Sequence, residues 1–270
     1  MRIFSIKDET LPSEVTLAYL IYLKLSNTFY IEVPDNADPS DLPLILSTLF
    51  RGKKRTIDPF WSRRWVQYRI VPSERQNIGQ IIRENGLREY DEFSLLLRSM
   101  GRCEQDDCYM EEVFECDLPT WLLERWENRI EEIIPLDTPE LLVLCRNGVK
   151  RVNANSLCAK YSVPFSMDQQ VFDKAEILPG GFGVKWNGGA LFLYSDLPKE
   201  AEKIDLSDQM LQKYVQCRLI SMSEVCRMLN CSRQNIDDLI RRGKLHPVQS
   251  MGNNTLFRKS EITERVSIVS

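Results

Sequence analysis

The distribution of apolar residues changes its period along the chain, and the first stretch has the pattern of β-strands. Residues 15–23 and residues 29–34 are rich in aromatic and β-branched side chains, and the polar residues Ser26, Asn27 and Thr28 lie between them. Two such runs around a polar turn predict a β-hairpin near the N-terminus.

Short helices are predicted after this hairpin, because residues that start and stop helices recur at suitable spacings. A longer helix is predicted to begin at Asp117 and Pro119 and to run toward Ile134, before Pro135 and Pro139 mark a domain boundary. The three short helices are bounded by Asp58-Pro59 at the start of the first, Ser73 and Gly86 around the second, and Asp91 and Gly101 around the third.

The middle of the chain returns to strand-like runs separated by glycine turns. Residues 141–146 and 149–152 flank Asn147-Gly148, a strong hairpin signal because both residues tolerate a positive φ. The pattern predicts a small antiparallel sheet. Three further strands of this sheet are predicted at residues 175–178, 183–186 and 191–194, with turns at 179–181 and 187–189.

Residues 220–245 have the spacing of two short helices joined by a tight turn. Each helix has an apolar face at intervals of three and four residues. Ser232 can cap the second helix, and Gly243 lies where a left-handed residue would end it. This pattern predicts a helix-turn-helix. The apolar residues are Val225, Cys226 and Leu229 in the first helix and Ile236, Leu239 and Ile240 in the second.

The residues after the second helix predict a two-stranded wing, 248–250 and 255–258, and then a closing helix from Lys259. The whole of residues 219–262 resembles the winged helix-turn-helix of excisionases and MerR-type regulators. The resemblance implies binding of duplex DNA, because side chains at the start of a recognition helix can reach base edges. The implied DNA-binding residues are Ser232, Arg233, Gln234, Asn235, Arg241, Arg242, Lys244, Arg258 and Lys259.

Two further stretches resemble known families. Residues 59–72 followed by residues 90–102 are similar to the N-terminal, non-catalytic region of HipA-type kinases, which implies a kinase of that type as a protein partner. The kinase catalytic lobe is not recognisable in this chain. The middle segment resembles a small uncharacterised β-rich bacterial domain through Phe172, Trp186 and Asp196-Leu197, and that family implies no activity.

The charges are strongly segmented, although the 35 basic and 39 acidic residues nearly balance over the 270-residue chain. Residues 51–70 carry a net charge of +6, residues 101–140 carry −10, and residues 211–259 carry +6. Such segmentation matters more for binding partners than the total charge does. In residues 51–70 the helical spacing of Phe60, Trp61, Trp65 and Tyr68 favours anchoring in the core over a nucleic-acid platform.

The sequence does not favour an enzyme, a metal site or a cofactor. His246 is the only histidine, and none of the eight cysteines forms a C-x-x-C pair, so no zinc ligand set is predicted and reduced thiols are expected. Carboxylates such as Glu104, Asp106 and Asp107 lack a neighbouring base or nucleophile. No apolar run is long enough for a membrane helix, and a cytoplasmic location is expected.

Together these patterns predict an α+β protein of three domains, residues 1–134, 135–200 and 201–270. The leading hypothesis is a transcriptional regulator that binds an operator in duplex DNA, as the antitoxin or autoregulator of a HipA-like toxin–antitoxin operon. A homodimer is one candidate form, and the sequence leaves the oligomeric state open. The alternative is a protein-interaction adaptor that does not bind DNA. Asp237 and Asp238 favour the adaptor, because acids on a recognition helix repel phosphate.

Overall fold

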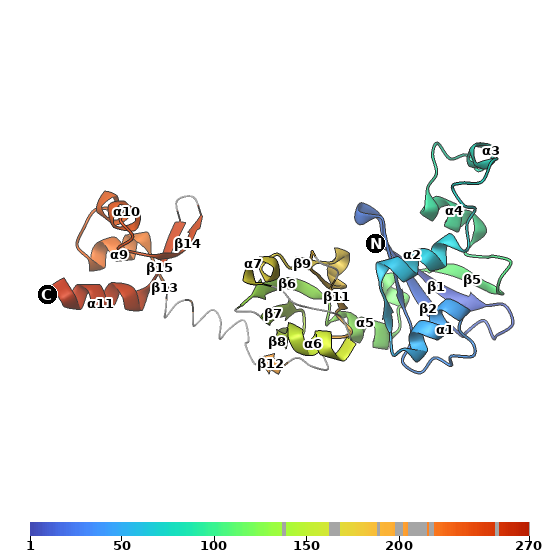
Figure 1. Ribbon diagram of the computed structural model, residues 1–270, viewed down its shortest axis with the longest axis horizontal. Coiled ribbons are helices and arrows are strands. Elements are labelled where there is room, and N and C mark those ends of the chain that lie inside the picture. The colour runs from blue at the N-terminus through green and yellow to red at the C-terminus, as the bar shows by residue number, and fades with distance from the viewer. Residues whose placement is uncertain are drawn as a thin grey trace. The chain divides into compact units, whose positions relative to one another are not determined.

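The chain forms two compact units, residues 1–204 and residues 205–270, coloured along the chain in Figure 1. The computed structural model describes residues 1–136, 139–161, 168–187, 190–197, 202–204, 215, 219–251 and 254–269. Helices alternate with small antiparallel sheets, so the fold is α+β, as the sequence predicts. Among the described residues, no helix combines the length and the apolar character needed to cross a membrane.

A five-stranded antiparallel sheet with the order β4-β3-β2-β1-β5 organises the first unit. The predicted hairpin is confirmed as β2 and β3, with Tyr22 opposite Phe29. Strand β1 was not predicted from the sequence; it lies between β2 and β5, with Phe4 opposite Leu20. The strands are β1 Arg2–Asp8, β2 Ala18–Leu23, β3 Thr28–Glu32, β4 Thr56–Ile57 and β5 Cys108–Val113.

Residues from this sheet and from helices along the same stretch of chain form one hydrophobic core. Two predicted caps are confirmed, because Asp58 accepts a hydrogen bond from the Trp61 amide at 3.1 Å and Asp91 accepts one from the Ser94 amide at 2.6 Å. The predicted Ser73 cap is wrong, since its hydroxyl bonds to the neighbouring Glu74 carboxylate instead. The helices are α1 Leu44–Arg51, α2 Pro59–Gln67, α3 Ile78–Glu84 and α4 Glu92–Ser99.

The long helix predicted from Asp117 toward Ile134 is wrong. Helix α5 spans only Thr120–Trp126, and Ile130–Pro135 forms strand β6. The β-branched residues of this stretch pair with β7 (Glu140–Cys145), where their side chains pack better than on a helix. The domain boundary predicted at residue 134 therefore falls inside a β-hairpin, whereas the one predicted at residue 200 lies close to the division between the units.

The middle of the chain contains the predicted strands, but they belong to two sheets. Strand β7 joins a four-stranded sheet, β12-β8-β7-β6, and the later strands form a three-stranded sheet, β11-β10-β9. The chain does turn at Asn147-Gly148, but the two residues do not both take the predicted positive φ. Gly148 has a φ of +128° and pairs with Cys145 in the sheet, whereas Asn147 does not have a positive φ. The remaining elements are β8 Gly148–Asn153, α6 Ala154–Tyr161, α7 Gln169–Phe172, β9 Glu176–Ile177, β10 Gly183–Lys185, β11 Leu191–Leu193 and β12 Glu202–Ile204.

A second core joins the five-stranded sheet to the middle of the chain. It contains Ile3, Ile21 and Tyr30 from the sheet together with many buried residues between positions 118 and 197. The ring of Tyr30 stacks on Phe182 with a centroid distance of 4.0 Å. Residues on both sides of position 134 therefore stabilise each other.

Candidate nucleic-acid interface

The second unit is a helix-turn-helix with a wing and a closing helix, as the sequence predicts. Its core contains Val225 from the first helix, Ile236 from the second, Phe257 from the wing and Ile262 from the closing helix, all fully or almost fully buried. Among the described residues of this unit, the short strand β13, which pairs with β15, is the element that was not predicted from the sequence. The elements are β13 Leu219–Ser221, α9 Met222–Met228, α10 Arg233–Arg241, β14 Pro247–Met251, β15 Asn254–Arg258 and α11 Lys259–Val269.

Local hydrogen bonds set where each of the two helices begins. A capping box starts α9, because the Glu224 side chain accepts the Ser221 amide at 2.8 Å while the Ser221 side chain accepts the Glu224 amide. The hydrogen bond from the Ser221 amide lowers the pKa of Glu224. Ser232 caps α10 as predicted by accepting the Asn235 amide at 3.3 Å.

Two left-handed residues close the turns around α10. Asn230 has a φ of +48° between the helices, and Gly243 has a φ of +65° just after α10, where the sequence places the end of the helix. Asparagine and glycine tolerate this conformation better than other residues do. The start and the direction of α10 are therefore fixed by residues at both of its ends.

All nine predicted DNA-binding residues are exposed, but they lie in separate places on the unit. Ser232 and the three residues after it form the N-terminal end of α10. Arg241, Arg242 and Lys244 lie at its other end, roughly 12 Å away at 1.5 Å per residue. Arg258 ends the second wing strand, and Lys259 begins α11.

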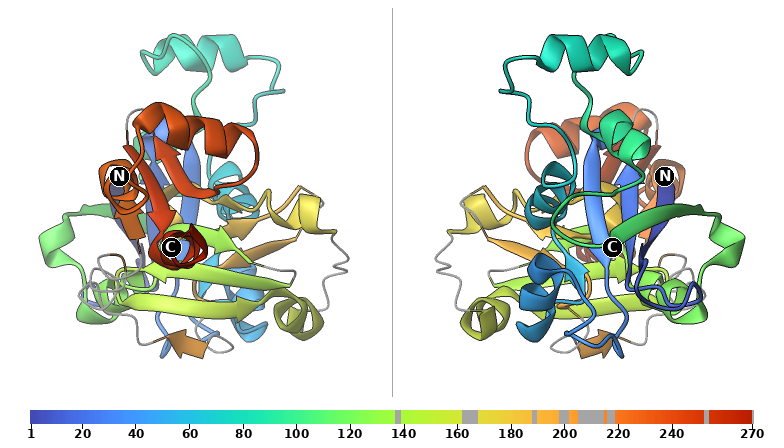
Figure 2. Two further views of the ribbon diagram at one scale, coloured as in Figure 1. Left: turned by 90° about the vertical axis from the view of Figure 1, so that its left-hand side faces the viewer. Right: turned by 90° about the vertical axis from the view of Figure 1, so that its right-hand side faces the viewer.

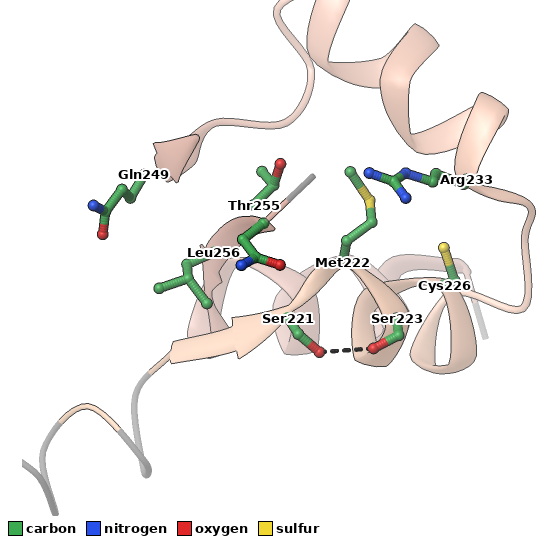
Figure 3. A pocket seen from close by; sticks show the side chains of 9 residues that line it. Ser221, Met222, Ser223, Cys226, Arg233, Gln249, Thr255 and Leu256 are labelled. Atoms are coloured by element: carbon green, nitrogen blue, oxygen red, sulfur yellow. Dashed lines mark hydrogen bonds between the residues drawn. The ribbon is translucent and has the colours of Figure 1, made fainter. Parts of the chain in front are cut away.

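An open groove of about 760 Å³ lies between the two helices and the wing, as Figure 3 shows. Arg233 is the predicted residue that lines it, whereas Arg258 borders a separate depression beside His246. The polar wing residues Gln249, Asn254 and Thr255 were not predicted as site residues, because they served only to predict the strands and the turn of the wing. The groove is lined by Ser221, Met222, Ser223, Cys226, Arg233, Gln249, Asn254, Thr255 and Leu256.

The two acids of the recognition helix have different surroundings. The Asp238 carboxylate pairs with the Arg242 guanidinium at 2.6 Å, one helical turn away. No ion pair of Asp237 is found among the described residues, and its side chain is exposed. The negative charge of Asp238 is therefore partly neutralised within the helix, while that of Asp237 faces solvent.

The described part of the chain holds no group of three or more histidine, cysteine, aspartate or glutamate side chains placed to bind a metal ion. In the second unit, His246 lies 3.3 Å from Glu261 and the two groups form an exposed pair. Residues 219–269 contain eight basic and five acidic residues, a net charge of +3. The chemistry available at this surface is therefore hydrogen bonding and charge.

Part of the second unit matches a known protein family. A protein family described as a helix-turn-helix domain matches residues 219–266. No curated protein and no solved structure matches the chain. The family match supports the resemblance to the excisionase-type helix-turn-helix, whereas the resemblances to HipA-type kinases and to the β-rich bacterial domain are not supported.

Proposed function

We propose that this protein is a transcriptional regulator whose second unit binds duplex DNA with the N-terminal end of α10 in the major groove. The observation that supports this proposal is that Arg233, Gln234 and Asn235 are exposed on the first turn of α10. Ser232 caps this helix, and an open groove lies beside its first turn. Arginine pairs with guanine edges, and glutamine and asparagine pair with adenine edges. Three such residues in succession provide side chains for direct readout of bases.

The other basic residues fit contacts to the phosphate backbone. Arg241 and Lys244 lie at the C-terminal end of α10, Arg258 ends the second wing strand, and Lys259 follows it. Contacts of this kind position a protein on DNA without reading its sequence. The wing and the C-terminal end of α10 then hold the recognition turn against the base edges.

We further propose the narrower role of antitoxin or autoregulator of a HipA-like operon. That prediction rests on the resemblance of residues 59–72 and 90–102 alone. Copurification of a kinase encoded beside this gene tests it. Recovery of the regulator without any such partner would contradict it.

The adaptor hypothesis remains the second candidate, because the exposed carboxylate of Asp237 lies on the helix that would enter the groove. A basic partner protein would be attracted by this acid, whereas DNA is repelled by it. The ion pair with Arg242 partly neutralises the second acid of this helix, Asp238, and so reduces its repulsion of DNA phosphates.

A duplex selection followed by a salt series tests DNA binding by the full chain. Sequences enriched from a random duplex pool should bind with an affinity that falls steeply as salt rises, because neutralised phosphates release counterions. Replacing Arg241 and Lys244 with alanine should reduce the salt dependence by about two in the log–log slope. Lys174→Ala, an exposed charge deletion in the first unit, is the control and should change neither quantity. Absence of binding at low salt would overturn the proposal.

A further inference from the structure

The turn between α9 and α10 brings two cysteines together. It lies in the second unit, which is drawn in orange and red in both views of Figure 2. The Cys231 amide donates a hydrogen bond to the Cys226 carbonyl at 3.0 Å, and the Asn230 amide donates one to the Arg227 carbonyl at 3.4 Å. With Asn230 at a φ of +48°, these two bonds form a Schellman motif, in which side chains at the positions of Cys226 and Cys231 commonly contact each other.

The backbone hydrogen bond limits how far apart the two cysteines can be. Standard bond lengths on either side of this hydrogen bond keep the Cα atoms of Cys226 and Cys231 within about 7 Å of each other. Disulfides join cysteines whose Cα atoms are up to roughly 7 Å apart. A disulfide between these two residues is therefore within reach of the folded backbone.

One of the two thiols opens onto the groove of the second unit. Cys226 lines this groove together with Arg233, so small molecules in the solvent can reach its sulfur (Figure 3). Cys231 is half-buried, and both cysteines pack against the core of the unit. Burial raises the pKa of Cys231, and the charge of a Cys226 thiolate adds to the increase, as expected for neighbouring thiols.

We propose that Cys226 and Cys231 are a redox-active pair, which a hydroperoxide oxidises to a reversible disulfide, and that this disulfide weakens DNA binding. The effect on DNA rests on the function proposed above, whereas the formation of the disulfide does not. In the reduced state the two cysteines act as small apolar residues of the core, in agreement with the expectation of reduced thiols.

The oxidation consumes one hydroperoxide molecule. The Cys226 thiolate attacks a peroxide oxygen, the O–O bond breaks, an alcohol leaves and a sulfenic acid remains on Cys226. The Cys231 thiolate then attacks the sulfenic sulfur, the S–O bond breaks, and the hydroxide leaves as water after taking up a proton. Two electrons pass from the sulfurs to the peroxide, and the two thiol protons end in the alcohol and the water.

The disulfide would form next to the start of the recognition helix. Cys231 directly precedes Ser232, whose side chain caps α10, and Arg233 follows on the first turn. Bringing the two sulfurs to a bond length of about 2 Å draws Cys231 toward the end of α9 and displaces the cap with it. Arg233 then loses its position for reading bases, so the affinity for a selected duplex should fall about tenfold, within the range for one lost base contact.

Peptide mapping of the full chain tests the disulfide without DNA. Trypsin cuts after Arg227, between the two cysteines, so only a disulfide keeps residues 219–227 attached to residues 228–233. Folded protein treated with hydrogen peroxide should yield this linked pair of peptides, and dithiothreitol should separate it. Cys116→Ser, which removes an exposed thiol of the first unit, is the control and should give the same linked pair. Absence of the linked pair from the wild-type protein would overturn the proposal and leave both cysteines as apolar residues only.

Duplex binding before and after oxidation tests the effect on DNA. The oxidised wild-type protein should bind the selected duplex about tenfold more weakly, and dithiothreitol should restore its affinity. A double variant, Cys226→Ser with Cys231→Ser, should keep its affinity after peroxide treatment, which also controls for oxidation of Met222 in the groove. Equal affinity of the linked and the reduced protein would overturn the proposed effect on DNA. A reduced protein that binds no duplex would instead overturn the function proposed above, while the linked peptides would still confirm the disulfide.

Discussion

The Tyr194 hydroxyl donates a hydrogen bond of 2.6 Å to the carboxylate of Glu32, although 162 positions separate the two residues in the chain. Glu32 is fully buried, and Arg125 and Thr56 also donate to it, each at 3.0 Å. Burial raises the pKa of Glu32, and these donors oppose the increase. Burial also raises the pKa of Tyr194 well above its ordinary value, so the hydroxyl remains a donor.

Tyr194→Phe should therefore destabilise the first unit. The substitution leaves the ring in place but removes one partner of a buried carboxylate, which costs about 1–3 kcal/mol in the free energy of unfolding. All five tryptophans lie between residues 61 and 186, so their fluorescence during denaturant unfolding reports on this unit alone. Tyr68→Phe, at a residue that is 52% exposed, is the control. Equal stability of both variants would show that the hydrogen bond makes no net contribution.

The recognition turn and the end of the wing should differ in how they affect sequence preference. Arg233→Ala and Gln234→Ala remove side chains that can read base edges, so each should cost about 1–3 kcal/mol on the selected duplex and less on random duplex. Arg258→Ala should weaken both duplexes by the same factor. Fluorescence anisotropy with the two duplexes measures the ratio. A uniform loss in all three variants would mean that α10 does not read bases.

The two acids of α10 should also behave differently. Asp237→Asn removes an exposed charge without an ion pair among the described residues, so duplex binding should tighten and become more dependent on salt. Asp238→Asn should have a smaller effect, because the substitution also releases Arg242 from its ion pair. If the adaptor hypothesis holds instead, neither variant changes DNA binding and both slow association with a basic partner at low ionic strength.

The cysteines should react with thiol reagents in an order set by exposure. Among the six cysteines whose surroundings the structure describes, Cys116 is exposed and should be modified first, whereas Cys108 and Cys145 are buried and should react only on unfolding. Burial raises the pKa of Cys108 to about 12, with the nearby carboxylate of Asp106 adding to the shift, so its reactive thiolate is scarce at neutral pH. Peptide mass spectrometry after timed alkylation gives the order, with Cys116→Ser as the control. Rapid modification of folded Cys108 would contradict the assignment.

The second unit could be predicted in detail because its determinants are local. Ser232 and Gly243 bound α10, and the apolar steps from Ile236 to Ile240 match the observed packing. These helix ends and apolar faces depend on hydrogen bonds and turns between residues close in the chain, so they can be recognised from the sequence alone. The groove lining was missed because Gln249 and Thr255 come to line the same groove as Arg233 only after the wing has folded.

In the first unit, the predictions failed where the structure depends on contacts between segments that are far apart in the chain. The sequence of Ile130–Pro135 alone is compatible with the continuation of a helix. Only its pairing with β7, which the sequence does not display, makes it a strand. The same holds for β1, whose two neighbours lie at residues 18–23 and 108–113. In the same way, the aromatic residues of α2 share helical spacing, but only the packing of the whole unit decides that Trp65 is buried and Phe60 is not.

The long chain separation between Glu32 and Tyr194 has a consequence for synthesis of the protein on the ribosome. The strand that carries Glu32 leaves the ribosome early, but its carboxylate lacks one of its three side-chain donors until residue 194 has been added. The first unit therefore cannot complete its folding while the chain is shorter than this, since an incompletely paired buried carboxylate is costly. A nascent chain stalled at residue 150 should accordingly be cleaved readily by protease, whereas one stalled beyond residue 204, with room for the ribosomal tunnel, should resist.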